Sequence, residues 1–506
     1  MDHLEIEPTF NPHNGNGNGA LKGGLPYSAS GARRSPKTAT TKYQALLAVA
    51  AVAAVVAAAV SIAALARVNT THSGVVALQG SSNALRQSLD ADAGRYHFAV
   101  HEQRFPSKTR RPPGFEASSW ADVLADAEGK RVRFWMWSGN KNINAWVDDW
   151  LAPKVSDYFG VTLERVPQGA PAAVDTVAEE VAAGNTDNGS CDLVWINGVN
   201  FANLKKAGHA YGPWADRVPN SQNFDFGSAA IATDKGTPTE GLEMPYNTAQ
   251  SVFIYNKVHV AQPPKDVPAI VAWAKANPGK FTYSQATDFT GAMVVRTFFY
   301  HYAGVNADPA AWSGPLDEAK YAAVAPKVWA ALNELEPYLW KDPATGKQAY
   351  PASHETVREL FAKGDVWLEA AYDPNLAAQQ ILNNKWAEDS AQSYVLSTGN
   401  IMNTNYVAIP TNSGSKAAAM VVGNFIAHVE AMFRRTQPDV WGALQSFDPT
   451  APHIANSGWI SAFDYIDTHA ATPPVTELAT HRLPELDQSY VQRIEEDWEK
   501  FVKNKV

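Results

Sequence analysis

One short apolar run, Leu193 to Ile196, constrains the fold of this chain more than any other stretch. Its length and its lack of polar alternation predict a strand that is buried on both faces, as in a parallel sheet. The pair Asn197-Gly198 is typical of a turn, and we expect a helix to begin near Asn200. In open α/β sheets, ligands bind where strands end and helices begin. Asn197 is therefore a candidate for a small-molecule site, although its presence is equally explained by closing the turn.

The segments before this run repeat the order of strand and helix. Residues 131–137 and 161–166 have the composition of strands, and residues 143–151 between them carry apolar side chains at helical spacing. A further helix is expected from Pro171 to Gly184, because proline favours the first turn of a helix and glycine its end. Strands that alternate with helices in this way predict a parallel α/β layer.

A second α/β unit follows the first, between residues 256 and 402. Its strongest helical patterns cover residues 267–276, 292–303, 318–335 and 356–363. Residues 365–368 return as a strand, and Asp373-Pro374 is typical of the start of another helix. The C-terminal tail is expected to be helical, with Ile494 and Trp498 on one face.

Composition limits the partners and cofactors of the chain. Its 506 residues are enough for more than one domain, and its net charge is −9. A surface that binds nucleic acid needs an excess of Lys and Arg, so we expect no nucleic-acid partner. Cys191 is the single cysteine, which rules out an intramolecular disulfide and a cysteine-based metal cluster. We predict that the protein uses no cofactor and no bound metal.

The N-terminal part of the chain predicts a membrane anchor. Residues 1–43 are rich in Gly, Asn, Ser and Pro, and we expect a disordered cytoplasmic tail there. Residues 44–66 carry no charge, and a helix of that length, at about 1.5 Å per residue, would span a bilayer core of about 30 Å. A signal peptide cleaved after Ala66 is the alternative. Residues 67–117 are expected to be a stalk, so that residues 118–506 fold in an extracellular, periplasmic or lumenal compartment.

Motifs of catalysis are weak throughout the sequence. The chain has no G-x-S-x-G, H-E-x-x-H, P-loop or Rossmann glycine pattern, and we predict no catalytic residue. Glu369 and Asp373 are spaced as the carboxylates of a glycosidase would be, but a loop salt bridge and a helix cap explain them more simply. Tyr300 and Tyr302 suggest a ferric-ion site only by composition, because residues i and i+2 of a helix do not share a face.

A solute cleft needs less than an active site does, namely aromatic walls and a few fixed polar groups. We select residues that follow strands or lie where the chain would cross between its two units. The candidate ligand-binding residues are Trp137, Ser138, Asn142, Asn197, Tyr246, Asn247, Asp288, Glu369, Asp373 and Asn403. We expect about half of them to line the cleft. Their carboxylates and aromatic rings suit a polar or cationic organic solute, because an aromatic face attracts a cation.

Several separated motifs together resemble one known family. They are residues 137–150 (WSGNKNINAWVDDW), 189–201 (GSCDLVWINGVNF), 236–256 (GTPTEGLEMPYNTAQSVFIYN) and 405–425 (NYVAIPTNSGSKAAAMVVGNF). Their order resembles that of the extracellular solute-binding proteins of ABC importers, in the YnjB-like family with the type 2 periplasmic-binding fold. The resemblance covers roughly residues 118–506. The predicted membrane anchor departs from the family, since its bacterial members carry cleavable signals.

The resemblance implies an α/β fold of two lobes joined by two crossing strands, with the solute held between the lobes. We place the crossings at about residues 249–255 and 405–409. Lobe one then comprises residues 118–248 and 410–506, and lobe two comprises residues 256–402.

The implied function is the capture of a small-molecule solute by hinge closure, for ABC-type uptake or for sensing. The expected partners are the solute, an ABC permease with its ATPase, and the membrane through residues 44–66. We expect a monomer. The alternative is a hydrolase or transferase that uses cleft carboxylates on the same scaffold, and a pair of cleft acids with strongly shifted pKa values would favour it.

Overall fold

The computed structural model describes residues 103–107, 109–228, 230–346, 350–447, 463 and 468–505. All of them belong to one compact unit, Ser82–Val506. The expected cytoplasmic tail, the expected membrane span at residues 44–66 and most of the expected stalk lie outside the described residues. Within the described part of the chain, no helix is both long enough and apolar enough to cross a membrane.

Lobe one is built on a six-stranded sheet. Its strands are β1 (Arg131–Trp135), β2 (Thr162–Val166), β3 (Leu193–Ile196), β6 (Glu243–Gln250), β10 (Asn400–Ala408) and β11 (Arg482–Leu483). β1 lies between β2 and β3 and is parallel to both, as the alternation of strands and helices predicted. β10 runs antiparallel to β3 and to β6 and pairs in parallel with the short β11. The carboxyl ends of β1 and β3 therefore meet at one edge of the sheet.

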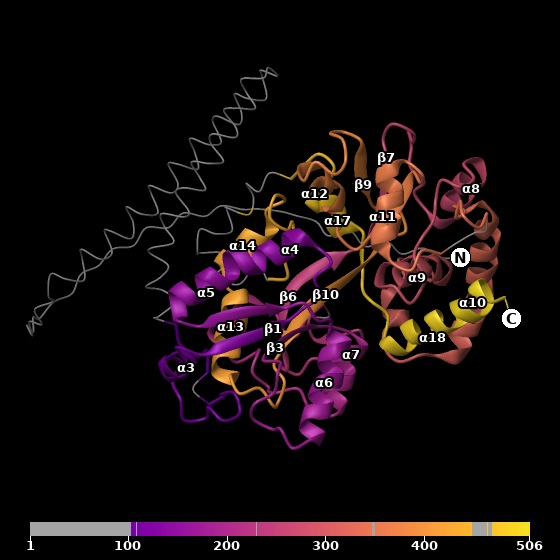
Figure 1. Cartoon of the computed structure of the whole chain (residues 1–506). Coiled ribbons are helices and arrows are strands. Elements are labelled where there is room, and N and C mark those ends of the chain that lie inside the picture. The colour runs from indigo at the N-terminus through magenta and orange to yellow at the C-terminus, as the bar shows by residue number, and fades with distance from the viewer. Residues whose placement is uncertain are drawn as a thin grey trace, which may run out of the picture. The chain divides into compact units, whose positions relative to one another are not determined.

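Helices cover both faces of this sheet (Figure 1). They are α3 (Trp120–Ala127), α4 (Lys141–Ala145), η1 (Trp146–Leu151), α5 (Ala152–Phe159), α6 (Ala170–Ala182), α7 (Val199–Lys206), η2 (Pro219–Asn223), α13 (Lys416–Ile426) and α14 (Val429–Thr436). Side chains of α3, α5 and α13 form one hydrophobic core with the sheet, and side chains of α6 and α7 form a second core on the opposite face. A two-strand hairpin, β4 (Thr233–Asp234) and β5 (Thr237–Pro238), extends from this lobe.

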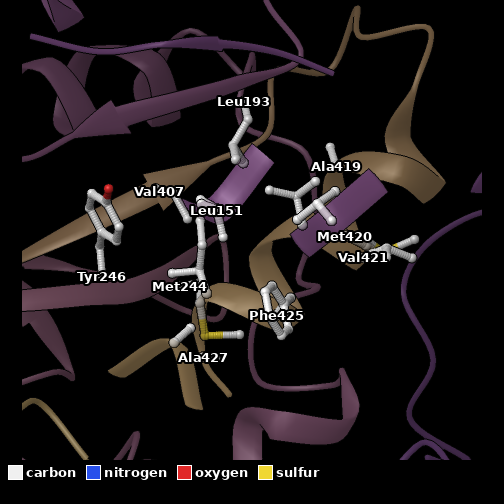
Figure 2. Packing of buried hydrophobic residues seen from close by; sticks show 14 of the residues in the cluster. Leu151, Leu193, Met244, Tyr246, Val407, Ala419, Met420, Val421, Phe425 and Ala427 are labelled. Atoms are coloured by element: carbon white, nitrogen blue, oxygen red, sulfur yellow. The ribbon is translucent and has the colours of Figure 1, made fainter. Parts of the chain in front are cut away.

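Successive side chains of β3 point to opposite faces of the sheet, and each face is covered by a hydrophobic core. Leu193 belongs to the core under α13, whereas Val194 and Ile196 belong to the core under α6 and α7. Figure 2 shows Leu193 and Val407, from neighbouring strands, on the side of the sheet where α13 presents Met420 and Phe425. A strand buried on both faces has no polar alternation, and this is why the sequence run could be recognised.

Lobe two has a smaller, three-stranded sheet in which β7 pairs antiparallel with both neighbours. Its strands are β7 (Val252–Asn256), β8 (Leu368–Ala371) and β9 (Ala391–Tyr394). Its helical segments are α8 (Val267–Ala276), α9 (Phe289–Ala303), η3 (Pro309–Trp312), α10 (Glu318–Leu335), η4 (Glu336–Tyr338), α11 (His354–Lys363), α12 (Leu376–Leu382), α17 (Val475–Thr480), α18 (Gln488–Trp498) and η5 (Glu499–Lys503).

The chain passes between the lobes at several places, and two of these passages, β6 to β7 and β9 to β10, lie next to each other. β6 belongs to the sheet of lobe one and β7 to that of lobe two, and only Ser251 separates them. The backbone N–H of Ser251 donates to the carbonyl of Ile401 at 2.8 Å, which ties this passage to the start of β10. The second crossing strand begins at Asn400, earlier than the expected residues 405–409, because its first residues pair with β11 rather than with β3.

The C-terminal helix packs in lobe two, and the sequence-based assignment of residues 410–506 to lobe one is wrong for this part. Ile494 and Trp498 of α18 share a hydrophobic core with α9 and α10. Trp498 Nε1 donates to the hydroxyl of Tyr283 at 3.1 Å, and the hydroxyl of Tyr321 donates to Asp497 at 2.8 Å. Helical spacing showed that α18 has an apolar face, but it carries no information about which core that face meets.

Candidate functional site

A cleft of about 390 Å³ is lined by residues from both lobes. Lobe one contributes mainly aromatic rings and amides: Trp137, Asn140, Ile143, Trp195, Asn197, Asn247 and Asn405. Lobe two contributes charged groups and two further rings: Asp288, Phe289, His354, Glu355, Arg358, Tyr372 and Asp373. The two walls therefore differ in chemistry, with the charges on one side.

Trp137 forms the aromatic wall of lobe one. It follows β1, and 48% of its surface is exposed, although its ring meets that of Trp195 edge-on at 6.5 Å. Gly139 lies so close to the ring that a Cβ at this position would be 2.2 Å from Cζ2 of Trp137. The absence of a side chain at Gly139 thus allows the Trp137 ring to lie over the turn, with its surface open to the cleft.

Amide groups from three strands form the floor of the cleft. Asn197 directly follows β3, and its Nδ2 donates to Oδ1 of Asn405 on β10 at 2.8 Å. Asn247 on β6 is the register partner of Asn405. Its Oδ1 is buried and has no hydrogen-bond partner among the described residues. A buried acceptor without a partner costs free energy, so Asn247 Oδ1 is available for a donor group in the cleft.

Asp288 and Phe289 start α9 on the opposite wall. The Asp288 carboxylate caps the helix by accepting from the N–H groups of Thr290 and Gly291 at 3.0 and 3.1 Å. The ring of Phe289 is 44% exposed and packs against Tyr372 at 4.7 Å. The cap fixes the carboxylate and the neighbouring ring together at the edge of the cleft.

Asp373 lies three residues before the start of α12, and its carboxylate accepts two hydrogen bonds. Its Oδ1 accepts from the N–H of Asn375 and its Oδ2 from Nε2 of Gln379, both at 2.8 Å. Burial raises the pKa of Asp373 to about 7, and the two hydrogen bonds together with Arg358 oppose that rise. The predicted role as helix cap is wrong, because α12 begins at Leu376 after Asn375.

His354 stands between the cleft and a fully buried carboxylate. Its Nε2 lies 2.8 Å from Oε1 of Glu369, whose side chain is not exposed at all. His354 lines the cleft, whereas Glu369 does not. The predicted pair of Glu369 and Asp373 is therefore not a pair of facing cleft acids: one reaches the cleft and the other only orients a histidine.

Five of the ten predicted site residues line the cleft, namely Trp137, Asn197, Asn247, Asp288 and Asp373. The other five do not, and each has a different reason. Ser138 accepts a hydrogen bond from Arg165 at 2.9 Å, and Asn142 accepts one from Asn383 across the two lobes at 3.1 Å. The side chains of these two residues thus have partners outside the cleft lining.

The remaining three are enclosed by other groups. Tyr246 is fully buried behind Trp195, with ring centroids 5.1 Å apart, and lies over the guanidinium of Arg435 at 5.6 Å. Glu369 lies behind His354, as described above. Asn403 is 6% exposed and faces Ala249 in the sheet. None of these three residues lines the cleft.

The sequence reasoning missed Asn405, Phe289, His354 and Arg358. Asn405 shares a strand face with Asn403, so the period of two was a usable signal, but the register with Asn247 was not available from sequence. Phe289 directly follows the predicted candidate Asp288.

Tyr300, considered above for ferric iron, is buried in lobe two and donates to the carbonyl of Pro484 at 2.7 Å. Among the described residues, no group of three His, Cys, Asp or Glu side chains is placed to hold a metal ion.

A cleft between two α/β lobes, with aromatic rings and amides facing carboxylates, defines a two-lobed solute-binding protein. The family model of bacterial extracellular solute-binding proteins matches residues 150–432. The YnjB protein of Escherichia coli (strain K12) is 34% identical over 334 residues, which cover 66% of this chain and 84% of that protein.

A solved structure with the same fold is the spermidine/putrescine ABC transporter substrate-binding protein PotD from Streptococcus pneumoniae strain Canada MDR_19A. It matches with a TM-score of 0.50 at 12% identity, over 74% of this chain and all of that chain (100%). The chain belongs to the family of bacterial extracellular solute-binding proteins. The description of this family, extracellular solute binding, agrees with the cleft between the two lobes.

Proposed function

We propose that the protein captures a small polar or cationic organic solute in this cleft by hinge closure, and that a membrane anchor at residues 44–66 holds it beside its partners. The observation that carries the proposal is that two exposed aromatic rings and two carboxylates line one cleft. Trp137 comes from lobe one and Phe289 from lobe two, and Asp288 and Asp373 line the same cleft.

The charges of the cleft favour a cation over an anion. Three carboxylates line it, from Asp288, Glu355 and Asp373, against one guanidinium, from Arg358. An aromatic face adds roughly 0.5–2 kcal/mol for a cation placed over it, more when water is excluded. A solute with a positive or hydrogen-bond-donating group would meet acceptors on both walls, including Asn247 Oδ1.

Hinge closure is supported by the contacts that bridge the lobes. Nδ2 of Asn140 donates to Oε1 of Gln379 at 3.1 Å, next to the bridge between Asn142 and Asn383. The proposed hinges are the passages at Ser251 and at the start of β10, where single segments of chain connect the two sheets. A solute that touches both walls gains contacts only when the lobes are together, so it would select the closed arrangement.

In the cell, the bound solute would be handed to an ABC permease with its ATPase, or its presence would be sensed. The proposed anchor keeps the binding domain at the outer surface of the membrane, where the local concentration near a permease is high. We propose a monomer, because one chain supplies both walls of the cleft.

A thermal-shift screen of the full chain tests the solute class. A ligand that binds only the folded state raises the melting temperature. At a hundredfold excess over Kd it adds about 2.7 kcal/mol to the free energy of unfolding. We expect stabilisation by members of a panel of organic cations and polar organic solutes. Stabilisation only by inorganic anions or only by metal ions would contradict the proposal.

Matched variants locate the effect in the cleft. Trp137→Ala should reduce the affinity for the stabilising solute about tenfold, because it removes one aromatic face. Asp365→Asn changes an exposed acid of lobe two outside the cleft and should leave the affinity unchanged. Equal losses in the two variants would place the binding site elsewhere.

A further inference from the structure

The hairpin of β4 and β5 carries a cation from lobe one to the edge of lobe two. Its turn consists of Lys235 and Gly236, with φ values of 43° and 85°. Two successive residues with positive φ are typical of a two-residue hairpin turn of type I′, in which Asn-Gly is the favoured pair. The conformation of the turn therefore does not favour lysine at the first position, since Asn tolerates a positive φ better.

The turn is in direct contact with the start of α18. The N–H of Gln488 donates to the carbonyl of Lys235 at 2.9 Å. A Cβ on Gly236 would lie 2.0 Å from Oδ2 of Asp487, the residue that caps α18. The hairpin thus contacts the start of α18, which follows β11 of the lobe-one sheet after a four-residue connection, and the contact leaves no space for a side chain at Gly236.

The Lys235 ammonium group lies in the electrostatic field of lobe two. Its Nζ is 4.9 Å from the centroid of the Phe289 ring, the ring that lines the cleft. Burial lowers the pKa of Lys235 and Arg296 adds to this lowering, whereas the carboxylates of Glu485, Asp234 and Glu495 oppose it, Glu485 most strongly. Arg296 lies 3.5 Å from Glu485 and 3.6 Å from Glu495, so the lysine completes a group of two cations and two carboxylates.

Asp234, the residue directly before Lys235, contacts the backbone next to the floor of the cleft. The carboxylate of Asp234 accepts a hydrogen bond from the N–H of Gly198, the residue directly after Asn197. Lys235 contacts Phe289 on the opposite wall. The hairpin therefore joins one residue next to the amide floor to one ring of the charged wall.

We propose that Lys235 is a positioning residue of the solute site: it holds Phe289 and the start of α18 against lobe one and thereby sets the closed arrangement of the cleft. The proposal rests on the hinge closure proposed above. Removal of the ammonium group leaves the hairpin and Phe289 intact but takes away the attraction between the lobes at this edge. The population of the open arrangement then rises, and the apparent affinity for the solute falls in proportion to the closed fraction.

The test measures the distance between the lobes in the full chain without added solute. Cys191 is buried, so two introduced cysteines can be labelled selectively. Asp175→Cys on α6 and Lys327→Cys on α10 place spin labels on exposed positions of the two lobes. Double electron–electron resonance then gives the closed and open populations directly.

Three variants make the result specific. Lys235→Asn removes the cation and suits the positive φ of the turn, and we expect the ratio of closed to open populations to fall about tenfold. Lys235→Arg keeps a cation near Phe289 and should restore the ratio. Lys206→Met, an exposed lysine of α7 in the same lobe, should leave it unchanged.

An unchanged distance distribution in Lys235→Asn would overturn the proposal, as would an equal change in Lys206→Met or a failure of Lys235→Arg to restore the ratio. These outcomes are separate from those of the thermal-shift screen, which reads the solute class without labels. A failed screen with a Lys235-dependent distance would reject the proposed solute and retain the positioning role.

Discussion

Asp373 lines the cleft, and burial raises its pKa into the neutral range. Its pKa of about 7 means that the carboxylate needed to attract a cation is lost as the pH falls through that value. We predict that the affinity for a cationic solute rises between about pH 6 and pH 8 in the wild type and is nearly constant in Asp373→Asn. Isothermal titration calorimetry across this range checks it, and an equal pH dependence in both proteins would contradict it.

The same residue makes a prediction for stability. The pKa of Asp373 is raised above that of an unfolded chain, so the folded protein keeps a proton that the unfolded chain has lost. Its contribution to the free energy of unfolding is therefore present at low pH and is lost as the pH rises from about 4 to about 7. Asp234, with a pKa raised to about 7 by burial, adds a slope of the same sign. Urea denaturation of Asp373→Asn should show a smaller fall in stability over this window, with the contribution of Asp234 remaining.

The substitution Asn197→Ala distinguishes a role of Asn197 in solute binding from a role in the turn. Asn197→Ala removes the donor to Asn405 and leaves the backbone turn at Gly198 in place. A lost hydrogen bond of about 1 kcal/mol corresponds to roughly a fivefold loss of solute affinity, with little change in melting temperature. Asn203→Ala, on the exposed side of α7, is the matched control. A large drop in melting temperature without a separate loss of affinity would mean that Asn197 serves the turn alone.

Helix α18 shows what local sequence can and cannot determine. Its apolar face was visible from the spacing of Ile494 and Trp498, yet its partner helices α9 and α10 are more than a hundred residues away in the sequence. The same limit applies to Asn403 and Asn405: alternation places both on one face of β10, and only the register with β6 shows that Asn405 reaches the cleft. By contrast, β3 was predictable because a strand buried on both faces of a parallel sheet is apolar over its whole length, whereas β1 and β2 carry charged residues such as Arg133 and Glu164.

The packing of α18 in lobe two can be measured through Trp498. The side chain is fully buried, donates to Tyr283 and meets the ring of Tyr350 edge-on at 5.1 Å. Trp498→Ala should lower the free energy of unfolding by about 3–5 kcal/mol, because it leaves a large cavity. Trp137→Ala, which alters a half-exposed ring, should cost less than about 1 kcal/mol. Similar losses for the two substitutions in chemical denaturation would contradict this assignment of α18.

For the whole molecule, the architecture places every charged group of the cleft on lobe two and the amide floor on lobe one. A solute must then contact both lobes to satisfy its polar groups, which links recognition to closure. This division could not be read from the sequence, because it depends on which ends of α9, α11 and α12 converge. The family motifs nevertheless predicted the two-lobed fold, since several of them lie at these strand ends and crossings.

The membrane anchor is a separate prediction at this scale. Deletion of residues 44–66 should move the protein from the membrane fraction to the soluble fraction without changing the melting temperature of the binding domain. A truncation of residues 1–43 alone should leave it in the membrane fraction. Equal partitioning of the two truncated proteins would indicate that residues 44–66 do not anchor the chain.

The most direct test of the central claim is mass spectrometry of the small molecules released when the purified full chain is denatured. The wild type should carry a polar or cationic organic compound, and the double variant Trp137→Ala with Asp373→Asn should carry about tenfold less of it, because both an aromatic face and a carboxylate of the cleft are lost. The same compound at equal occupancy in both proteins, or only an inorganic ion in the wild type, would contradict the assignment of this cleft as the solute site.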